Sequence, residues 1–255
     1  MKITQVRNAT LLVEVGDQRV LVDPMLGVAG SLDPFEATSG DTSRNPTVEL
    51  GVPLGDLLAP DVVVVTHTHV DHWDDAAAAL LPRDVPLLAQ HDADAAAVTA
   101  HGFRDVRVLA GTVAVGPTTF TRTGGRHGSE EVLAAVPALG EVSGVVVRHP
   151  GEPVLYVAGD TVLTDDVLAA LAEHRPDVVV LNTGEAQVGP GLTLLMGAQD
   201  VLEVHRAVPG AVVVAVHMEA LNHCTVTREQ VRALAREHDL GGAVLVPEDG
   251  EVLSF

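Results

Sequence analysis

The chain reads VVVVTHTHVDHW over residues 62–73, so four valines are followed at once by three histidines and an aspartate. A continuous run of β-branched residues is typical of a strand that is buried on both faces. Because alternate residues of an extended chain face the same way, His67 and His69 can converge on one ion. The chain then turns, and Asp71 with His72 can face a second point close by. Imidazole and carboxylate groups without a thiolate favour Zn²⁺, Mn²⁺ or Fe in a catalytic site over a closed, cysteine-rich structural site.

Three more side chains that can bind a metal ion follow other strand segments, and they are His127, Asp160 and His217. Each comes just beyond an apolar or glycine-containing run, where loops gather at one edge of a sheet. The alternative is that the histidines form a solvated turn. Chance placement of seven such residues at strand ends is a poor explanation, so the sequence predicts a metal centre.

Apolar strands and helices alternate on both sides of this segment. Residues 3–15 and 19–23 predict strands that form a hairpin, and residues 27–58 predict a long irregular loop, which in a domain of this kind is functional or mobile. Further strands are predicted at 61–66, 85–89, 145–148, 153–158, 177–181, 211–216, 243–246 and 251–255, two more within 105–123, and helices at 74–81, 92–100, 164–173, 198–206 and 227–238. This order predicts an α/β fold (α+β in some schemes), with two mixed sheets packed face to face and helices outside. No linker divides residues 1–255, so we expect a single unit.

The charge and the apolar content of the chain indicate what kind of molecule it can bind. The 255 residues include 35 acidic and 15 basic side chains, for a formal charge of −20, and 47% of them are hydrophobic. A strongly acidic chain repels polyphosphates, so we expect a small-molecule substrate and no nucleic acid. Cys224 is the only cysteine, no N-terminal signal segment is visible, and no stretch approaches about 18 apolar residues. These features predict a cytoplasmic protein without a membrane partner, and they leave the oligomeric state open.

The run His67-x-His69-x-Asp71-His72, together with His127, Gly159-Asp160-Thr161 and His217, resembles the metallo-β-lactamase superfamily. The resemblance covers essentially the whole chain and is greatest to the zinc-dependent hydrolase branch that includes ascorbate-phosphate-type lactonases. It implies one metallo-β-lactamase-like hydrolase domain over residues 1–255, folded as a four-layer αββα sandwich. By position, it also implies two groups of ligands. One metal ion would be bound by His67, His69 and His127, and the other by Asp71, His72 and His217, with Asp160 bridging the two.

The resemblance also implies a reaction. Two divalent ions, Zn²⁺ first and Mn²⁺ or Fe²⁺ as alternatives, would lie about 3.5–4 Å apart and share a water whose pKa falls toward about 7. The bridging hydroxide would cleave an ester-type bond of a small molecule, preferably a lactone, without a covalent intermediate. Asp71 is a candidate proton shuttle as well as a ligand. A small-molecule phosphodiesterase and a non-catalytic metal-binding scaffold are the alternatives.

Several residues near these motifs have two interpretations. His223 could donate a proton to a carbonyl or leaving-group oxygen, oriented by Asn222, or both could be loop residues that satisfy backbone groups. Trp73 either walls the pocket or packs beneath the loop. Thr183-Gly184-Glu185 either lines the cleft or forms a plain turn, and Arg126 either holds an anionic group or makes a surface ion pair. Cys224 is expected to pack rather than to bind metal, and the remaining histidines are assigned to the surface, namely His91, His101, His149, His174, His205 and His238.

Overall fold

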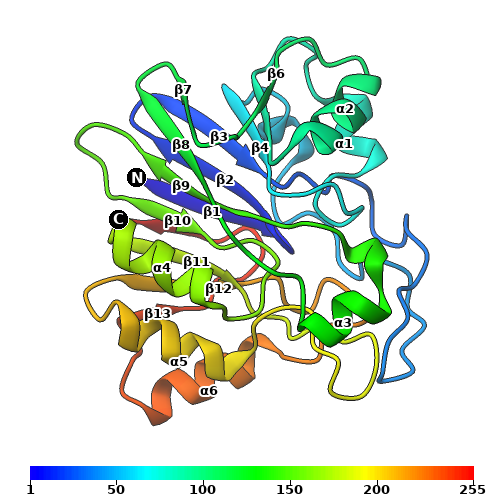
Figure 1. The fold of residues 1–255 in the computed structure, drawn as a ribbon, viewed down its shortest axis with the longest axis vertical. Helices are drawn as coiled ribbons and strands as arrows, with labels where there is room; N and C mark the ends of the chain where they lie inside the picture. Colours follow the sequence, from blue (N-terminus) through cyan, green and yellow to red (C-terminus); the bar gives the residue numbers. More distant parts are fainter.

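The computed structural model describes the backbone of residues 1–255 and all of their side chains except that of Ala138. Two sheets of seven strands each pack face to face, and helices cover their outer faces (Figure 1). The predicted αββα arrangement is therefore confirmed. Within the described chain, no helix combines the length and the apolar character that crossing a membrane requires.

The first sheet has the strand order β14-β1-β2-β3-β4-β5-β6. Its antiparallel part, β14 to β3, continues into a parallel part, β3 to β6. The strands are β1 (Lys2–Arg7), β2 (Thr10–Val15), β3 (Gln18–Val22), β4 (Val62–Val65), β5 (Leu87–Ala89), β6 (Val106–Val108) and β14 (Val252–Ser254), and the helices of this half are η1 (Leu54–Leu57), α1 (Asp75–Leu80) and α2 (Asp92–Ala100).

The second sheet has the strand order β13-β12-β11-β10-β9-β8-β7. Strands β10 to β13 are parallel, whereas β7, β8, β9 and β10 pair antiparallel. The strands are β7 (Thr112–Val115), β8 (Thr118–Thr123), β9 (Gly144–Arg148), β10 (Leu155–Val157), β11 (Val178–Asn182), β12 (Val212–Val216) and β13 (Val244–Leu245), and the helices are α3 (Glu130–Ala135), η2 (Pro137–Leu139), α4 (Asp165–His174), α5 (Ala198–Ala207) and α6 (Arg228–Glu237).

Strand β4 shows why the valine run is continuous. Val62 and Val64 point into the core between the two sheets, whereas Val63 and Val65 pack against the layer that contains α1 and α2. All four side chains are fully buried, so each contributes roughly 1.5–3 kcal/mol of hydrophobic stabilisation. Strand β11 is arranged in the same way between the central core and helices α4 to α6. Residues 62–65 and 178–181 therefore need to be apolar at every position, which is the pattern that the sequence shows.

The prediction of two strands within residues 105–123 is wrong. The segment forms three strands, of which β6 belongs to the first sheet and β7 and β8 belong to the second. The chain crosses from one sheet to the other around Gly111, and a turn at Gly116, whose φ is 59°, separates β7 from β8. The short elements η1, α3 and η2 are absent from the prediction, and η1 lies within the segment 27–58 that is predicted to be irregular.

Candidate metal centre

The seven predicted ligands lie together at one edge of the two sheets. The segment that follows β4 supplies four of them, and the loops after β8, β10 and β12 supply His127, Asp160 and His217. Their ligand atoms form two groups, and within each group all lie within 4.8 Å of one another. We name these the three-histidine cluster (His67, His69 and His127) and the carboxylate cluster (Asp71, His72, Asp160 and His217).

The three-histidine cluster brings nitrogen atoms close together. His67 Nε2 lies 3.0 Å from His69 Nδ1, and the ring centroids of His69 and His127 are 5.1 Å apart. The other ring nitrogens of two members have partners: His67 Nδ1 lies 3.1 Å from Thr66 Oγ1, and His127 Nδ1 lies 3.0 Å from the Leu194 carbonyl oxygen. Burial lowers the pKa of His67 well below its usual value, and it also lowers the pKa of His127. Neutral imidazoles are the form that binds metal ions.

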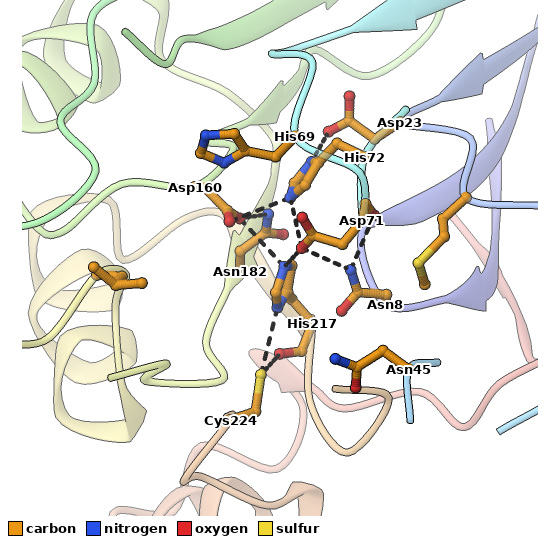
Figure 2. A network of polar contacts seen from close by, with 12 residues as sticks. Asn8, Asp23, Asn45, His69, Asp71, His72, Asp160, Asn182, His217 and Cys224 are labelled. Carbon is orange, nitrogen blue, oxygen red and sulfur yellow. Dashed lines mark hydrogen bonds and ion pairs between the residues drawn. The ribbon is translucent and has the colours of Figure 1, made fainter. Parts of the chain in front are cut away.

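In the carboxylate cluster two imidazoles face two carboxylates (Figure 2). His72 Nε2 lies 3.2 Å from Asp160 Oδ2 and 3.6 Å from Asp71 Oδ2. His217 Nε2 lies 3.3 Å from Asp71 Oδ2 and 3.5 Å from Asp160 Oδ1. Among the described residues, neither buried Nε2 atom has a partner with hydrogen-bond geometry. Unpartnered nitrogens that face buried carboxylate oxygens fit a divalent cation.

The charges of this cluster are strongly coupled. Burial lowers the pKa of His72, but the carboxylates of Asp160, Asp71 and Asp23 outweigh burial and raise it to about 10. Burial raises the pKa of Asp160, but His217 and His72 outweigh it and bring that pKa well below the usual value. Burial lowers the pKa of His217, but Asp160 and Asp71 outweigh burial and raise that pKa well above its usual value. Without a cation the two imidazoles therefore carry protons that balance the carboxylates. A metal ion would have to displace these protons in order to bind.

Asp160 connects the two clusters. Its Oδ2 atom lies 3.8 Å from His127 Nε2 in addition to its contact with His72. This position agrees with the bridging role that the resemblance implies, although the binding of metal by each of the seven residues stays a prediction. Asn182, at the end of β11, donates from Nδ2 to Asp160 Oδ1 at 2.6 Å and so orients the carboxylate (Figure 2).

Asp23 is a site residue that the sequence analysis did not identify. It follows β3, and its Oδ2 atom lies 2.8 Å from His72 Nδ1. The same carboxylate accepts hydrogen bonds from the backbone N–H and the hydroxyl of Thr66, both at 2.7 Å. Asp23 therefore orients one imidazole and anchors the start of the ligand segment, as partners of metal-bound histidines commonly do. Its position after a strand that neighbours β4 is the signal that could have revealed it.

Asn8, between β1 and β2, is a second such residue. Its Nδ2 atom donates to the Asp71 carbonyl oxygen at 3.2 Å, and its own carbonyl accepts from the His217 N–H at 3.1 Å. Both Asn8 and His217 have positive φ angles, of 52° and 65°. An asparagine tolerates this conformation readily, whereas a histidine rarely adopts it. The hydrogen bond between the two residues holds His217 in this strained backbone geometry, as is common at functional sites.

A cavity of about 340 Å³ lies against both clusters. Four predicted ligands line this cavity, together with His223; the ligands are His69, Asp71, His127 and Asp160. The other lining residues are Phe35, Glu36, Thr68, Val70, Leu139, Val188 and Leu194. Among these described residues there is no lysine or arginine. Phe35 belongs to the irregular segment 27–58, and Val188 belongs to the loop between β11 and α5. Apart from the predicted ligands and His223, the lining is therefore mainly apolar.

The structure resolves most of the open interpretations. Trp73 is buried with α1 and α2 and packs on Phe103 at 5.5 Å between ring centroids, so it packs beneath the loop. Arg126 pairs with Glu130 at 3.8 Å on the surface. None of Thr183, Gly184 and Glu185 lines the cavity at the clusters, and the segment is irregular chain rather than a turn, in which the Gly184 carbonyl accepts from the Thr225 N–H. The six remaining histidines are all at least partly exposed, in agreement with their assignment to the surface.

The segment after His217 divides into different roles. His223 lines the cavity, and burial lowers the pKa of its imidazole to about 4, so the ring is neutral at pH 7. Its catalytic role stays a prediction. The Asn222 side chain forms hydrogen bonds with backbone and side-chain groups of residues 35–45. Asn222 is therefore a loop residue that satisfies backbone groups, rather than one that orients His223. Cys224 Sγ lies 3.8 Å from His217 Nδ1, so the thiol contacts the outer side of a predicted ligand (Figure 2).

Comparison with known proteins identifies the family. The beta-lactamase superfamily domain matches residues 18–218 of the chain. The UPF0173 protein YddR of Bacillus subtilis is 41% identical over the full length of both chains. The crystal structure of an isothiocyanate hydrolase from Delia radicum gut bacteria is 40% identical, with a TM-score of 0.95 over 100% of this chain and 99% of the other. That of a possible metal-dependent hydrolase from Veillonella parvula is 37% identical, with a TM-score of 0.97 over the same shares. The chain therefore belongs to the metallo-β-lactamase superfamily and, within it, to the UPF0173 family of metal-dependent hydrolases.

Proposed function

We propose that this enzyme hydrolyses a small, uncharged and largely apolar compound with an electrophilic carbon, and that an isothiocyanate is the first candidate. The observation that carries this proposal is the cavity, in which apolar side chains face the two clusters and no cationic side chain lies among the described lining residues. The 40% identical relative described as an isothiocyanate hydrolase supports the choice of compound.

The charge of the cavity wall disfavours anionic substrates. Sites for anionic phosphodiesters commonly add Lys, Arg or helix N-termini to the metal ions. The charged lining residues are instead Asp71, Asp160 and the exposed Glu36. A neutral R–N=C=S molecule can place its R group against Val70, Leu139 or Val188 and direct its central carbon toward the clusters. We therefore expect a small-molecule substrate and neither nucleic acid nor membrane as a partner.

The reaction balances with one water. The water oxygen bonds to the central carbon, both of its protons pass to the nitrogen, and the carbon–nitrogen bond breaks to give R–NH₂ and O=C=S. Two divalent metal ions held by the clusters, with Zn²⁺ as our first candidate, would supply Lewis acidity and a water of lowered pKa. Asp71 reaches the cavity and can accept a proton from the attacking water. His223, as a neutral imidazole, can relay a proton to the leaving nitrogen.

A lactone is the second candidate. It is also uncharged, it has an electrophilic carbonyl carbon, and it would fit an apolar wall equally well. A small phosphodiester and a metal-binding protein without turnover are the remaining alternatives, and each predicts a different result in the same experiment.

The deciding experiment measures metal content and activity on one sample purified without chelators. The panel contains alkyl and aromatic isothiocyanates, lactones of matched size, and bis-p-nitrophenyl phosphate. We expect bound divalent metal and a kcat/KM for isothiocyanates at least about tenfold above those of the other classes, which is about 1.4 kcal/mol of discrimination. Preference for the phosphodiester, or no turnover by fully loaded protein, would contradict the proposal.

Substitution of His223 tests its role separately. We expect His223→Gln to lower kcat by about 10²–10⁴-fold, which is typical for a lost proton-transfer group, while the metal content stays unchanged. His238→Gln, at an exposed position after α6, is the control and should match the wild type. An unchanged kcat in His223→Gln would remove this residue from the mechanism.

A further inference from the structure

Residues 32–45 form a closed loop that carries Phe35 to the cavity. Leu32 and Asn45 pair as an antiparallel bridge, and the backbone hydrogen bonds between them are 2.7 and 3.0 Å long. Between these two residues the chain contains no helix and no further strand pairing in the described structure. Phe35 lies on this loop, half-buried, and lines the cavity with its neighbour Glu36. The position of the Phe35 ring therefore depends on whatever fixes the loop.

The Asn222 side chain fixes it. Its Oδ1 atom accepts from the Phe35 N–H at 3.0 Å and from Asn45 Nδ2 at 2.8 Å. Its Nδ2 atom donates to the carbonyl oxygens of Phe35 at 2.8 Å and Asp41 at 2.7 Å. The Asn222 backbone N–H also donates to Asn45 Oδ1 at 2.9 Å. Asn222 is 4% exposed, so one buried amide satisfies both backbone groups of Phe35.

The next residue along the chain extends this contact. The His223 ring packs edge-to-face on the Phe35 ring, with 4.8 Å between centroids and 78° between planes. Asn222 therefore holds the Phe35 backbone while His223 contacts the Phe35 side chain. Both residues lie in the segment that begins with His217, a predicted ligand. The loop is thus fixed relative to the metal centre and not only to the rest of the surface.

We propose that Phe35 sets the size of the substituent that the cavity accepts, and that Asn222 is the positioning residue that holds Phe35 in place. This inference rests on the proposed function, because it concerns the substituent of the same small, uncharged substrate. The alternative is a purely structural role, in which Asn222 only stabilises a surface loop. The two differ in what they predict for selectivity. If Asn222 only stabilises the loop, its substitution lowers thermal stability and leaves the substrate preference unchanged. If Asn222 positions Phe35, its substitution changes which substrates fit the cavity.

The first test is a selectivity profile for Phe35→Ala. The substrates are n-alkyl isothiocyanates from methyl to octyl. We expect the kcat/KM of the variant to reach its maximum at a longer chain than that of the wild type. For each additional methylene that becomes buried, its kcat/KM should rise by about fourfold. The shift should lie in KM more than in kcat, because the ring contacts the substituent and not the reacting carbon. Val28→Ala is the matched control, since Val28 lies near the same loop, is 68% exposed and does not line the cavity.

The second test separates positioning from stability. Asn222→Ala should broaden the chain-length profile toward that of Phe35→Ala and raise amide hydrogen exchange in residues 33–41, with unchanged metal content. Asn222→Asp keeps the two acceptor bonds but places a carboxylate oxygen against the carbonyl oxygens of Phe35 and Asp41, so its profile should broaden at least as far as that of Asn222→Ala. A loss of thermal stability in both variants with a wild-type chain-length profile would overturn the positioning role.

A binding series makes the result independent of turnover. Alkyl hydroxamates from acetohydroxamate to octanohydroxamate chelate metal ions through one end and probe the apolar wall with the other, and calorimetry measures their affinity for the metal-loaded protein. We expect the gain with chain length to stop earlier in the wild type than in Phe35→Ala. Identical series for Phe35→Ala and Val28→Ala would overturn the inference. If isothiocyanates are not turned over, the proposed function fails, but this series still decides the role of Phe35.

Discussion

The three-histidine cluster and the carboxylate cluster lie side by side but differ in charge and support. The first offers three imidazoles, and His69 among them is partly exposed at the cavity. The second combines two imidazoles with two carboxylates, all four buried. Asp23, Asn182 and Asn8 hold the members of the second cluster, whereas the first receives one hydroxyl and one backbone carbonyl.

This difference indicates that the two clusters bind metal ions with different affinities. Two carboxylates attract a divalent cation far more strongly than neutral imidazoles do, and burial reduces the screening of that attraction. The carboxylate cluster should therefore hold its ion more tightly. The three-histidine cluster, with fewer supporting contacts and a partly exposed member, should exchange its ion more readily.

The largest effect is expected at Asp160, because that side chain contacts members of both clusters. We expect Asp160→Asn to lower hydrolysis by on the order of 10³-fold, equivalent to several kcal/mol of lost metal-derived stabilisation, and to reduce the bound metal. Metal analysis and kcat/KM on the same sample check this. Asp17→Asn, in an exposed turn, is the control. Full activity in Asp160→Asn would rule out a bridging role.

Breaking one cluster at a time tests the proposed difference directly. His127→Ala should keep about one ion per chain, in the carboxylate cluster, whereas His72→Ala should lose the tightly held ion. Titration of the wild type with a chelator should then remove metal in two steps, and His127→Ala should show the later step alone. A single step in the wild type, or an equal loss in the two variants, would show that the clusters bind metal with similar affinity.

A smaller effect is expected from Asp23, which contacts a predicted ligand without facing the cavity. Asp23→Asn should weaken metal binding by about 10–100-fold, because His72 loses a charged partner for its Nδ1–H group. Metal competition assays measure this change. Asp84→Asn removes a carboxylate from an exposed pair with Arg104 and should have no effect on metal affinity. Equal affinity in Asp23→Asn and the wild type would contradict the supporting role.

The smallest effect is expected at Cys224. Its Sγ atom contacts His217 Nδ1 at 3.8 Å and the His217 carbonyl oxygen at 3.6 Å, which are weak interactions. Cys224→Ser keeps a small polar group in that place, so metal content should be unchanged and kcat/KM should stay within a few-fold of the wild type. Loss of one metal ion in this variant would show that the thiol is a ligand.

Residue patterns along the chain were enough to predict the sandwich of two sheets and the seven side chains that meet at its edge. Strands buried on both faces require unbroken apolar runs, as in residues 62–65, and metal-binding residues at strand ends are conspicuous beside them. The resemblance of the histidine pattern to a known superfamily then predicted how the ligands divide.

The residues that surround that centre could be identified only from the folded chain. Asp23, Asn8 and Asn182 are ordinary polar residues in the sequence, and their roles arise because β1, β3 and β11 end beside the loops that carry the ligands. Phe35 and Asn222 are 187 positions apart along the chain and are joined by hydrogen bonds that no local pattern encodes. The physical reason is that hydrophobic periodicity reports which face of an element is buried, whereas partners across a sheet edge depend on how loops distant in sequence come together.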